Sequence, residues 1–285
     1  MTGQIKLTGM VLVSMPVGDY DRRLTILTKE RGKISAFAKG SRRPTSPLLG
    51  CSQPFSFGEF ILYEGKSSYN VVSAEISNYF TELRDDVESI YYAMYFCEFS
   101  CFMTKENLEA GEPLKLLYMS LRALSKPALH KKLVRRIFEL RFMAINGEMP
   151  QVEQCVLCGK EEMLKEQKGW FSPQEGGICC EECRKKRKQE RQREGTVRTK
   201  TSSGTQPADG IQSTADGRCQ PENDGLWVGT STIYTMQYIL ATPLEKLFTF
   251  MVSDEVLSEL AKAMEYFLEH HVGQKMKSEE LLEMF

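Results

Sequence analysis

The sequence lacks the residue groupings on which most enzymes depend. It has three histidines, no His-Glu-x-x-His motif, and no Gly-x-x-x-x-Gly-Lys-Ser/Thr loop to cradle a phosphate. Its acidic residues do not cluster in the N-terminal part as a two-metal nuclease would require. No apolar run approaches the roughly 20 residues of a membrane span, and the N-terminus does not join a basic region to an apolar core as a signal peptide does. These absences favour a non-enzymatic cytoplasmic protein that does not associate with a membrane.

The composition that is present describes a chain large enough for two domains. The 285 residues are 41% hydrophobic and 26% charged, which is typical of a globular protein with a sizeable core. The nine cysteines are an odd number. An odd count with several thiols in metal-binding spacing fits a reducing compartment better than an oxidising one.

The cysteines include two Cys-x-x-Cys pairs, Cys155 with Cys158 and Cys180 with Cys183. Each pair places two sulfurs on one tight turn, and two such turns brought together offer the four tetrahedral ligands that suit Zn²⁺. Buried structural thiols or disulfides are the alternatives. We predict one structural Zn²⁺ per chain in a ribbon over 151–185, because four protein ligands leave no open position for a catalytic water.

Residues 1–50 carry an excess of positive charge that the net charge of −1 conceals. Asp19, Asp21 and Glu30 are the acidic residues of this segment. Its cations are Lys6, Arg22, Arg23, Lys29, Arg31, Lys33, Lys39, Arg42 and Arg43. The asymmetry points to an anionic partner for the first domain, and the alternative is a solvated basic face.

Five stretches near the N-terminus have the composition and alternation of short strands. They are 5–14, 23–29, 33–39, 57–64 and 69–76. The second and third flank a Glu-Arg-Gly bend, which is typical of a hairpin. Five short strands over 1–80 favour a small closed barrel, and the OB-fold is the five-stranded candidate.

The third of these strands predicts a surface for single-stranded nucleic acid. Alternation places Phe37 on the outer face between Lys33 and Lys39, while small apolar residues occupy the inner face. Bases stack on an exposed ring while neighbouring cations neutralise phosphates; the alternative is that Phe37 packs under the loop at 44–54. The predicted DNA-binding residues are Lys33, Phe37, Lys39, Arg42, Arg43, Arg22 and Arg23.

The spacing of apolar residues changes from that of a strand to that of a helix near residue 85. Helices are expected from there, from about Pro113 and over 128–146, which makes 81–150 the first part of a helical domain. Cys97 and Cys101 are interpreted as core thiols of the first helix rather than as metal ligands. The third helix carries cations that are either solvated or extend a binding surface. Its auxiliary DNA-binding or protein-binding candidates are Lys132, Arg135 and Arg136.

The segment 186–224 begins with a basic run and continues with Ser, Thr, Gly, Gln and Asp. Such a segment cannot bury enough apolar surface to offset its ordering entropy, so we expect a disordered insertion. The second part of the helical domain is expected over 225–285. A capping box at 242–245 predicts the start of one helix there, and 254–271 has the pattern of another.

Four stretches carry motifs whose combination in this order is specific. They are Gly-Met-Val-Leu at 9–12 followed by Tyr-Asp-Arg-Arg-Leu-Thr-Ile-Leu-Thr-Lys-Glu-Arg-Gly-Lys-Ile at 20–34; Ala-Lys-Gly-Ser-Arg-Arg at 38–43; Phe-Glu-Leu-Arg-Phe at 138–142 with Gly147, Pro150 and the first cysteine pair; and Phe-Ser-Pro-Gln-Glu-Gly-Gly-Ile-Cys-Cys-Glu-Glu-Cys at 171–183. Together they resemble the RecO family of bacterial DNA recombination and repair proteins. Two features depart from the family pattern: the extra thiol of Cys179 and the length of the 186–224 insertion.

The resemblance implies an α+β multidomain protein in which an OB-fold barrel precedes a helical domain with an inserted zinc ribbon. It implies a mediator that binds single-stranded and double-stranded DNA and anneals complementary strands. It also implies that the protein helps RecA load onto strands covered by single-stranded-DNA-binding protein. The implied partners are RecR, the C-terminal tail of that binding protein and, indirectly, RecA. The alternative function is a protein adapter whose basic barrel binds acidic peptide tails.

Overall fold

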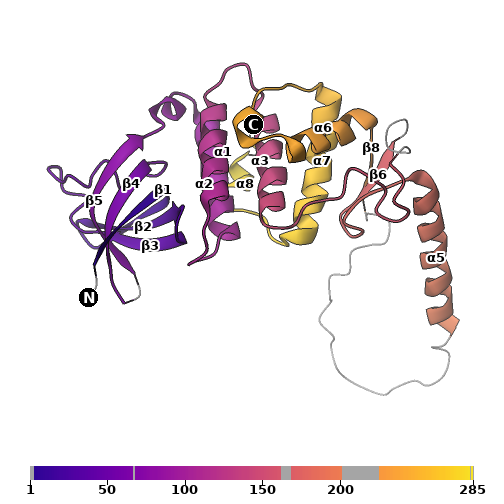
Figure 1. Cartoon of the computed structure of the whole chain (residues 1–285), viewed down its shortest axis with the longest axis horizontal. Coiled ribbons are helices and arrows are strands. Elements are labelled where there is room, and N and C mark those ends of the chain that lie inside the picture. Colours follow the sequence, from indigo (N-terminus) through magenta and orange to yellow (C-terminus); the bar gives the residue numbers. More distant parts are fainter. Residues whose placement is uncertain (1–2, 67, 162–167, 201–224, 283, 285) are drawn as a thin grey trace. The chain divides into compact units, whose positions relative to one another are not determined.

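Two units make up the chain in the computed structural model, which describes residues 3–66, 68–161, 168–200, 225–282 and 284 (Figure 1). The first unit comprises Met1–Glu148, Ile239–Met251 and Gln274–Phe285, and the second comprises Met149–Tyr238 and Val252–Gly273. The C-terminal segment predicted as one part of a helical domain is therefore divided between both units. Within the described residues, no helix is long and apolar enough to cross a membrane.

The first unit begins with the predicted five-stranded barrel. Its strands are β1 Gln4–Val17, β2 Asp21–Thr28, β3 Gly32–Ala38, β4 Phe57–Glu64 and β5 Tyr69–Asn78. They close in the order β1-β2-β3-β5-β4, with β3 and β5 parallel and the other pairs antiparallel. This arrangement confirms the OB-like barrel and the α+β class that the sequence predicts.

Alternation along β3 determines which side chains enter the barrel. Ile34, Ala36 and Ala38 are buried in the barrel core, whereas Lys33 and Phe37 are half-buried on the outer side. The loop before β4 also contributes two side chains, Leu48 and Cys51, to that core. The small inner residues of β3 leave room for the larger core residues of neighbouring strands such as Phe60 and Leu24.

The bend between β2 and β3 packs against the loop that follows the first helix. The backbone N–H of Lys33 donates to Lys105 O at 3.2 Å, and that of Asn107 donates to Arg31 O at 3.0 Å. Gly32 has φ +62°, and a Cβ there would meet Lys105 O at 2.3 Å. Only glycine therefore allows this approach, which attaches one end of the hairpin to the rest of the first unit.

Three helices complete the main body of the first unit: α1 Val87–Met103, α2 Gly111–Leu124 and α3 Lys131–Ile145. Asp86 caps α1 by accepting from the N–H groups of Glu88 and Ser89. Aromatic rings hold α1 against α3: Phe96 stacks on Phe138 with ring centroids 4.3 Å apart. A short 3-10 helix, Thr81–Asp85, precedes α1, and α8, Glu279–Leu282, lies near the C-terminus.

The second unit is built around a small antiparallel sheet with the strand order β7-β6-β8. Its strands are β6 Gly169–Ser172, β7 Gly177–Cys179 and β8 Leu226–Val228. Trp227 on β8 lies opposite Trp170 on β6, so the ribbon takes its third strand from beyond the insertion. The sequence predicts a ribbon that ends at 185 and places residues 226–228 in the helical domain. The structure adds them to the ribbon as β8, because pairing the two indoles removes apolar surface from water.

The remaining elements of the second unit are helical: α5 Glu181–Lys200, most of α6 Thr230–Ala241, and α7 Asp254–His271. The helix α5 corrects the prediction that disorder begins at 186, because Lys, Arg, Glu and Gln are good helix formers. Residues 201–224 lie outside the described residues.

The capping box at 242–245 opens only one 3-10 turn, Leu244–Lys246. The aromatic and β-branched residues that follow have weaker helix propensity.

Candidate nucleic-acid interface and metal site

The four predicted cysteine ligands come together in the second unit. The sulfur atoms of Cys155, Cys158, Cys180 and Cys183 all lie within 4.8 Å of one another, and those of Cys158 and Cys180 are 3.9 Å apart. Tetrahedral zinc with Zn–S bonds of about 2.3 Å needs sulfurs separated by about 3.8 Å. The chemistry and spacing of the donor set therefore fit a four-thiolate metal site. In the described residues Cys179 is outside this cluster.

The backbone around the cysteines prepares one sulfur to carry negative charge. Burial by itself raises the pKa of the Cys155 thiol, but N–H groups including that of Cys180, 3.3 Å from the sulfur, lower this pKa to about 7. Burial and neighbouring thiols raise the pKa values of Cys180 and Cys183. The surroundings thus favour a thiolate at Cys155, whereas Cys180 and Cys183 favour the neutral thiol.

Two tryptophans and one arginine pack beside the cysteine cluster. The guanidinium carbon of Arg184 lies 3.4 Å from the ring centroid of Trp170 and 5.1 Å from that of Trp227. Cys179 is buried opposite Trp170 in the β6–β7 register. Its side chain therefore belongs to the small apolar core of the ribbon, which is the physical reason that a cysteine can stand beside Cys180 without joining the cluster.

One end of the barrel presents a group of exposed cations beside an exposed aromatic residue. We define the barrel-end cluster as Tyr20, Lys39, Arg42 and Arg43. All four side chains are exposed, Tyr20 by 52%. The backbone N–H of Arg42 donates to Tyr20 O at 2.8 Å, and the guanidinium of Arg43 lies 5.0 Å from the Tyr20 ring centroid. The turn after β1 and the loop after β3 are thereby joined into one surface.

Asp21, next to Tyr20 in the sequence, has a structural role of its own. Asp21 accepts the backbone N–H of Gly40 at 2.7 Å, and Arg42 donates to Gly18 O at 3.1 Å. Among the described residues, none of the three cations forms an ion pair with a carboxylate. The cluster therefore offers positive charge that a bound anion would neutralise.

Tyr20 was not among the predicted binding residues. The sequence contained a signal for it, because Tyr20 opens the Tyr-Asp-Arg-Arg stretch, in which only Asp21 separates it from two predicted cations. Strand alternation could not identify it, since it lies in the turn before β2, and only the folded loop brings Arg43 to its ring.

The other predicted barrel residues are distributed differently. Lys33 stands at the opposite end of β3 from Lys39, roughly 20 Å away along the strand, and its ammonium donates to Cys101 O at 2.7 Å. Phe37 is half-buried, opposite Arg23 on β2 and Asn70 on β5. Arg23 is exposed, whereas Arg22 is half-buried and donates to Ser14 Oγ and Ser52 O. The structure therefore does not bring Lys33 to the barrel-end cluster.

The cations of α3 are mainly internal, which corrects the expectation of an exposed auxiliary surface. Arg135 is 8% exposed, Arg136 is 6% exposed, and both pair with Glu139, which is fully buried. Tyr95 donates to Glu139 Oε1 at 2.6 Å, and Arg135 also contacts Glu279. Burial opposes ionisation of Glu139, but the two guanidinium groups and the Tyr95 hydroxyl leave its pKa below the usual value.

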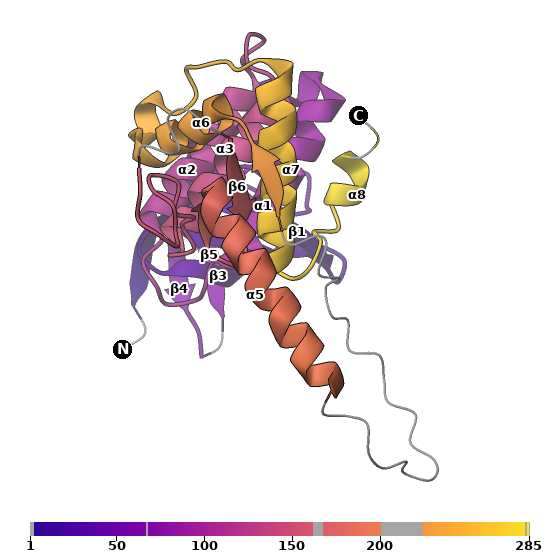
Figure 2. The same cartoon turned by 90° about the vertical axis from the view of Figure 1, so that its right-hand side faces the viewer.

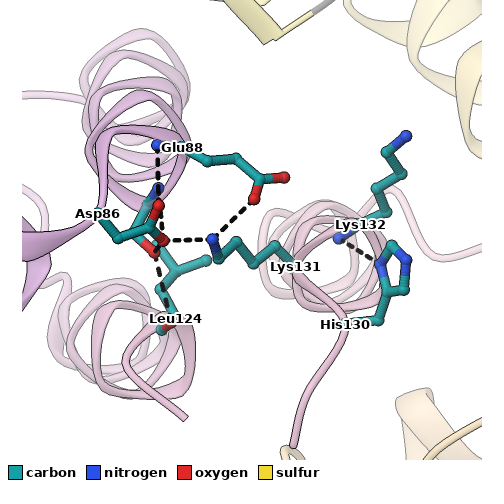
Figure 3. Close-up of polar contacts among 7 residues, drawn as sticks. Asp86, Glu88, Leu124, His130, Lys131 and Lys132 are labelled. Atoms are coloured by element: carbon teal, nitrogen blue, oxygen red, sulfur yellow. Dashed lines mark hydrogen bonds and ion pairs between the residues drawn. The ribbon is translucent and has the colours of Figure 1, made fainter. Parts of the chain in front are cut away.

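Among the three predicted cations of this surface, only Lys132, in the first turn of α3, is exposed to solvent. Lys131 extends between Asp86 and Glu88, with its ammonium 2.7 Å from Glu88 Oε2, while Lys132 extends away from that pair and is exposed (Figure 3). His130 caps the helix by accepting the N–H of Lys132 at 3.3 Å. Of the three auxiliary candidates, Lys132 is the exposed one.

Comparisons with known proteins cover nearly the whole chain. The model "Recombination protein O N terminal" matches residues 1–80, and "Recombination protein O C terminal" matches 84–195 and 197–280. A DNA repair protein RecO from Acetivibrio thermocellus is 30% identical over 268 residues, covering 94% of this chain and 92% of the relative. A second, from Alkaliphilus metalliredigens, is 38% identical over 180 residues, covering 63% and 72%. A third, from Clostridium perfringens, is 23% identical over 278 residues, covering 98% and 97%. The chain belongs to the Recombination protein O (RecO) family of DNA repair proteins.

Proposed function

We propose that this chain binds DNA through the barrel-end cluster and anneals complementary single strands without catalysing a covalent step. One observation carries the proposal. Lys39, Arg42 and Arg43 are exposed around the half-exposed ring of Tyr20, with no carboxylate partner among the described residues. Cations around an aromatic platform are the combination that binds single strands, because phosphates meet the charges while a base stacks on the ring.

The arrangement also supports sequence tolerance, which an annealing protein requires. Lysine and arginine side chains contact phosphates that are the same at every nucleotide. A tyrosine ring stacks with any base, since each base has a π-face. Binding by these groups leaves the hydrogen-bonding edges of the bases available for a complementary strand. Phe37, beside Arg23 on the barrel wall, remains a second stacking candidate.

The partners follow from family membership rather than from a described contact. We propose that the chain acts with RecR, contacts the C-terminal tail of single-stranded-DNA-binding protein, and so helps RecA to load. The alternative is an adapter whose barrel binds acidic peptide tails, since a carboxylate would also neutralise the barrel-end cations. The exposed ring of Tyr20 favours nucleic acid over an acidic tail, because a base can stack on it.

The test of DNA binding is the salt dependence of affinity for a labelled single-stranded oligonucleotide. The barrel variant combines Lys39→Gln, Arg42→Gln and Arg43→Gln. Losing three phosphate contacts should reduce the slope of log K against log salt by about 2, at roughly 0.7 per contact on a single strand. It should also slow annealing of complementary oligonucleotides in the absence of ATP.

The matched control removes three exposed lysines elsewhere, through Lys105→Gln, Lys246→Gln and Lys262→Gln. It makes the same change in net charge and should keep the wild-type slope. Equal slopes for the barrel variant and this scattered control would exclude the barrel end as the DNA site. A barrel variant that loses an acidic peptide but keeps DNA would favour the adapter.

We also propose that the four-cysteine cluster holds one structural Zn²⁺. Cys155, Cys158, Cys180 and Cys183 would supply all four ligands, and the ion would hold the turn at 155–158 against the start of α5. Elemental analysis should find one zinc per chain. Cys180→Ser should lose it, whereas Cys179→Ser should keep it because its sulfur is outside the cluster. Absence of zinc from the wild type, or the reverse result for the two variants, would contradict the assignment.

A further inference from the structure

The helix α5 extends away from the small sheet of its own unit (Figure 2). It begins one residue after Cys180 and continues to Lys200. Twenty residues at about 1.5 Å per residue make a helix roughly 30 Å long. It is the longest helix in the described residues.

Five consecutive residues of α5 are basic, after an acidic first turn that contains Glu181 and Glu182. Arg184 is followed by Lys185, Lys186, Arg187 and Lys188, and the last four side chains are exposed. Glu190 is the acidic residue that follows within the next turn. The segment 184–190 therefore carries five positive charges and one negative charge, in a chain whose net charge is −1.

The base of the helix is fixed to the ribbon. The Arg184 guanidinium lies over the Trp170 ring, and Arg187 Nε donates to Glu175 Oε1 at 3.1 Å. Cys183, in the first turn, belongs to the metal cluster. The exposed lysines that follow are thus presented from a rigid base, which lowers the entropy lost when a partner binds.

The isolated helix carries an electrostatic cost that an anionic partner would remove. Cations recur at spacings of three and four residues, as in Lys185 with Lys188 and Arg184 with Lys188, and such like-charge pairs destabilise a helix by a few tenths of a kcal/mol each. Lys185 is offset by Glu181 at 2.6 Å. Among the described residues, Lys186 and Lys188 form no ion pair. An anion with regularly spaced charges would relieve this repulsion along the helix.

We infer that α5 is a second DNA-binding surface, which contacts the phosphate backbone through Lys185, Lys186 and Lys188. The inference rests on the proposed annealing function in one respect: a protein that pairs two strands benefits from a second surface for DNA. The partner is double-stranded DNA, whose phosphates provide a denser and more regular array of charge than a single strand or a peptide tail. The surface reads no sequence, because lysines contact phosphates rather than base edges.

The experiment uses the full-length protein loaded with zinc and a labelled duplex. The arm variant combines Lys185→Gln, Lys186→Gln and Lys188→Gln, which leaves Arg184 on the tryptophans and Arg187 with Glu175. Between 50 and 200 mM salt, its affinity should fall about 40-fold less than that of the wild type, because three duplex contacts at about 0.9 each are missing. Replacing the same three lysines with arginine should preserve the wild-type salt dependence. The scattered control should do the same.

The barrel variant separates this inference from the proposed function. If the arm variant keeps the wild-type duplex slope while the barrel variant loses slope, the inference is wrong and the proposed function stands. If the arm variant loses slope while the barrel variant does not, the inference stands and the barrel site is wrong. Additive losses in the combined variant support both. Zinc content and the thermal midpoint of the arm variant should match the wild type, since its substituted side chains are exposed.

Discussion

The arginines of α3 and the cations at the end of the barrel carry the same charge but have opposite roles. Arg135 and Arg136 are buried and share the carboxylate of Glu139. Arg42 and Arg43 are exposed and lie beside Tyr20. The first pair forms ion pairs with carboxylates inside the protein. The second pair presents its positive charge to solvent, where an anionic partner can bind. The difference teaches that a basic stretch of sequence predicts charge but not accessibility.

The cause of the difference is the distribution of apolar residues around each stretch. On α3 the two arginines stand between Leu133 and Val134 on one side and Ile137 and Phe138 on the other, and all four apolar residues are buried. The helix is therefore enclosed nearly all round, and its buried cations need partners inside the protein. Residues 39–43, at the start of the loop after β3, contain no apolar side chain, so their cations remain in solvent.

The largest effect is expected from removing the buried carboxylate. Glu139→Gln leaves Arg135 and Arg136 without their shared counter-charge, and breaking such a buried pair costs about 3–5 kcal/mol. Urea unfolding of the variant should show a loss of this size in the free energy of unfolding. The control is the exposed Glu280→Gln, which should change stability by about 0.5 kcal/mol or less. Equal stability of the two variants would show that the α3 arginines are not structural.

The next effect concerns binding rather than stability. Tyr20→Ala should weaken single-strand affinity by about 1–3 kcal/mol if a base stacks on the ring, while the salt slope stays nearly unchanged because no charge is lost. Fluorescence anisotropy over a salt series measures both quantities. Phe37→Ala is the matched comparison: if it alone weakens binding, the stacking platform is the barrel wall. A Phe37→Ala variant that loses thermal stability but keeps affinity would assign its ring to packing.

The pH dependence of stability offers a third comparison. The pKa of Glu139 is held below its usual value of 4.5 in the folded protein. Its contribution is therefore complete above the unfolded pKa, and it is lost as pH falls through the folded value. Below about pH 4.5, the stability of the wild type should fall with a slope up to about 1.4 kcal/mol per pH unit steeper than that of Glu139→Gln. Parallel curves for the two proteins would contradict this account.

The smallest effect is expected at Lys33, which the sequence placed in the DNA site. Its ammonium donates to Cys101 O, so Lys33→Gln should lower stability by about 1 kcal/mol, as for loss of one hydrogen bond. The salt slope for DNA should remain that of the wild type. A drop of about 0.7 in the slope would instead show that Lys33 contacts a phosphate.

Much of the fold was predictable because its signals are local. The five strands, the three helices of the first unit and the helix ending at His271 were anticipated by the spacing of apolar residues or by start and stop signals such as Pro113 and Gly147, with boundaries close to those observed. The Cys-x-x-Cys pairs likewise identified the cluster that forms. β8 could not be anticipated as a strand of the ribbon, because its partner β6 lies on the other side of the insertion. Pairing between such distant segments leaves no periodic signal.

The candidate site was only partly predictable, for a related reason. Lys39, Arg42 and Arg43 form one surface because the loop after β3 folds back toward the turn before β2. Lys33, on the same outer face of β3, is withdrawn because the loop after α1 occupies that end of the hairpin. Alternation specifies a face of a strand, but it does not specify what covers that face.

The sequence by itself determined which four cysteines cluster, the barrel and its inward face, and the location of positive charge. These features depend on spacing over a few residues, and geometry along a single strand, helix or turn is enough to fix them. Only the tertiary structure decided which charges are accessible. Arg135 became internal because Glu139 and Tyr95 surround it, and Arg43 became part of a surface because Tyr20 reaches it. Accessibility depends on which distant segments pack together, and the local pattern of residues does not contain that information.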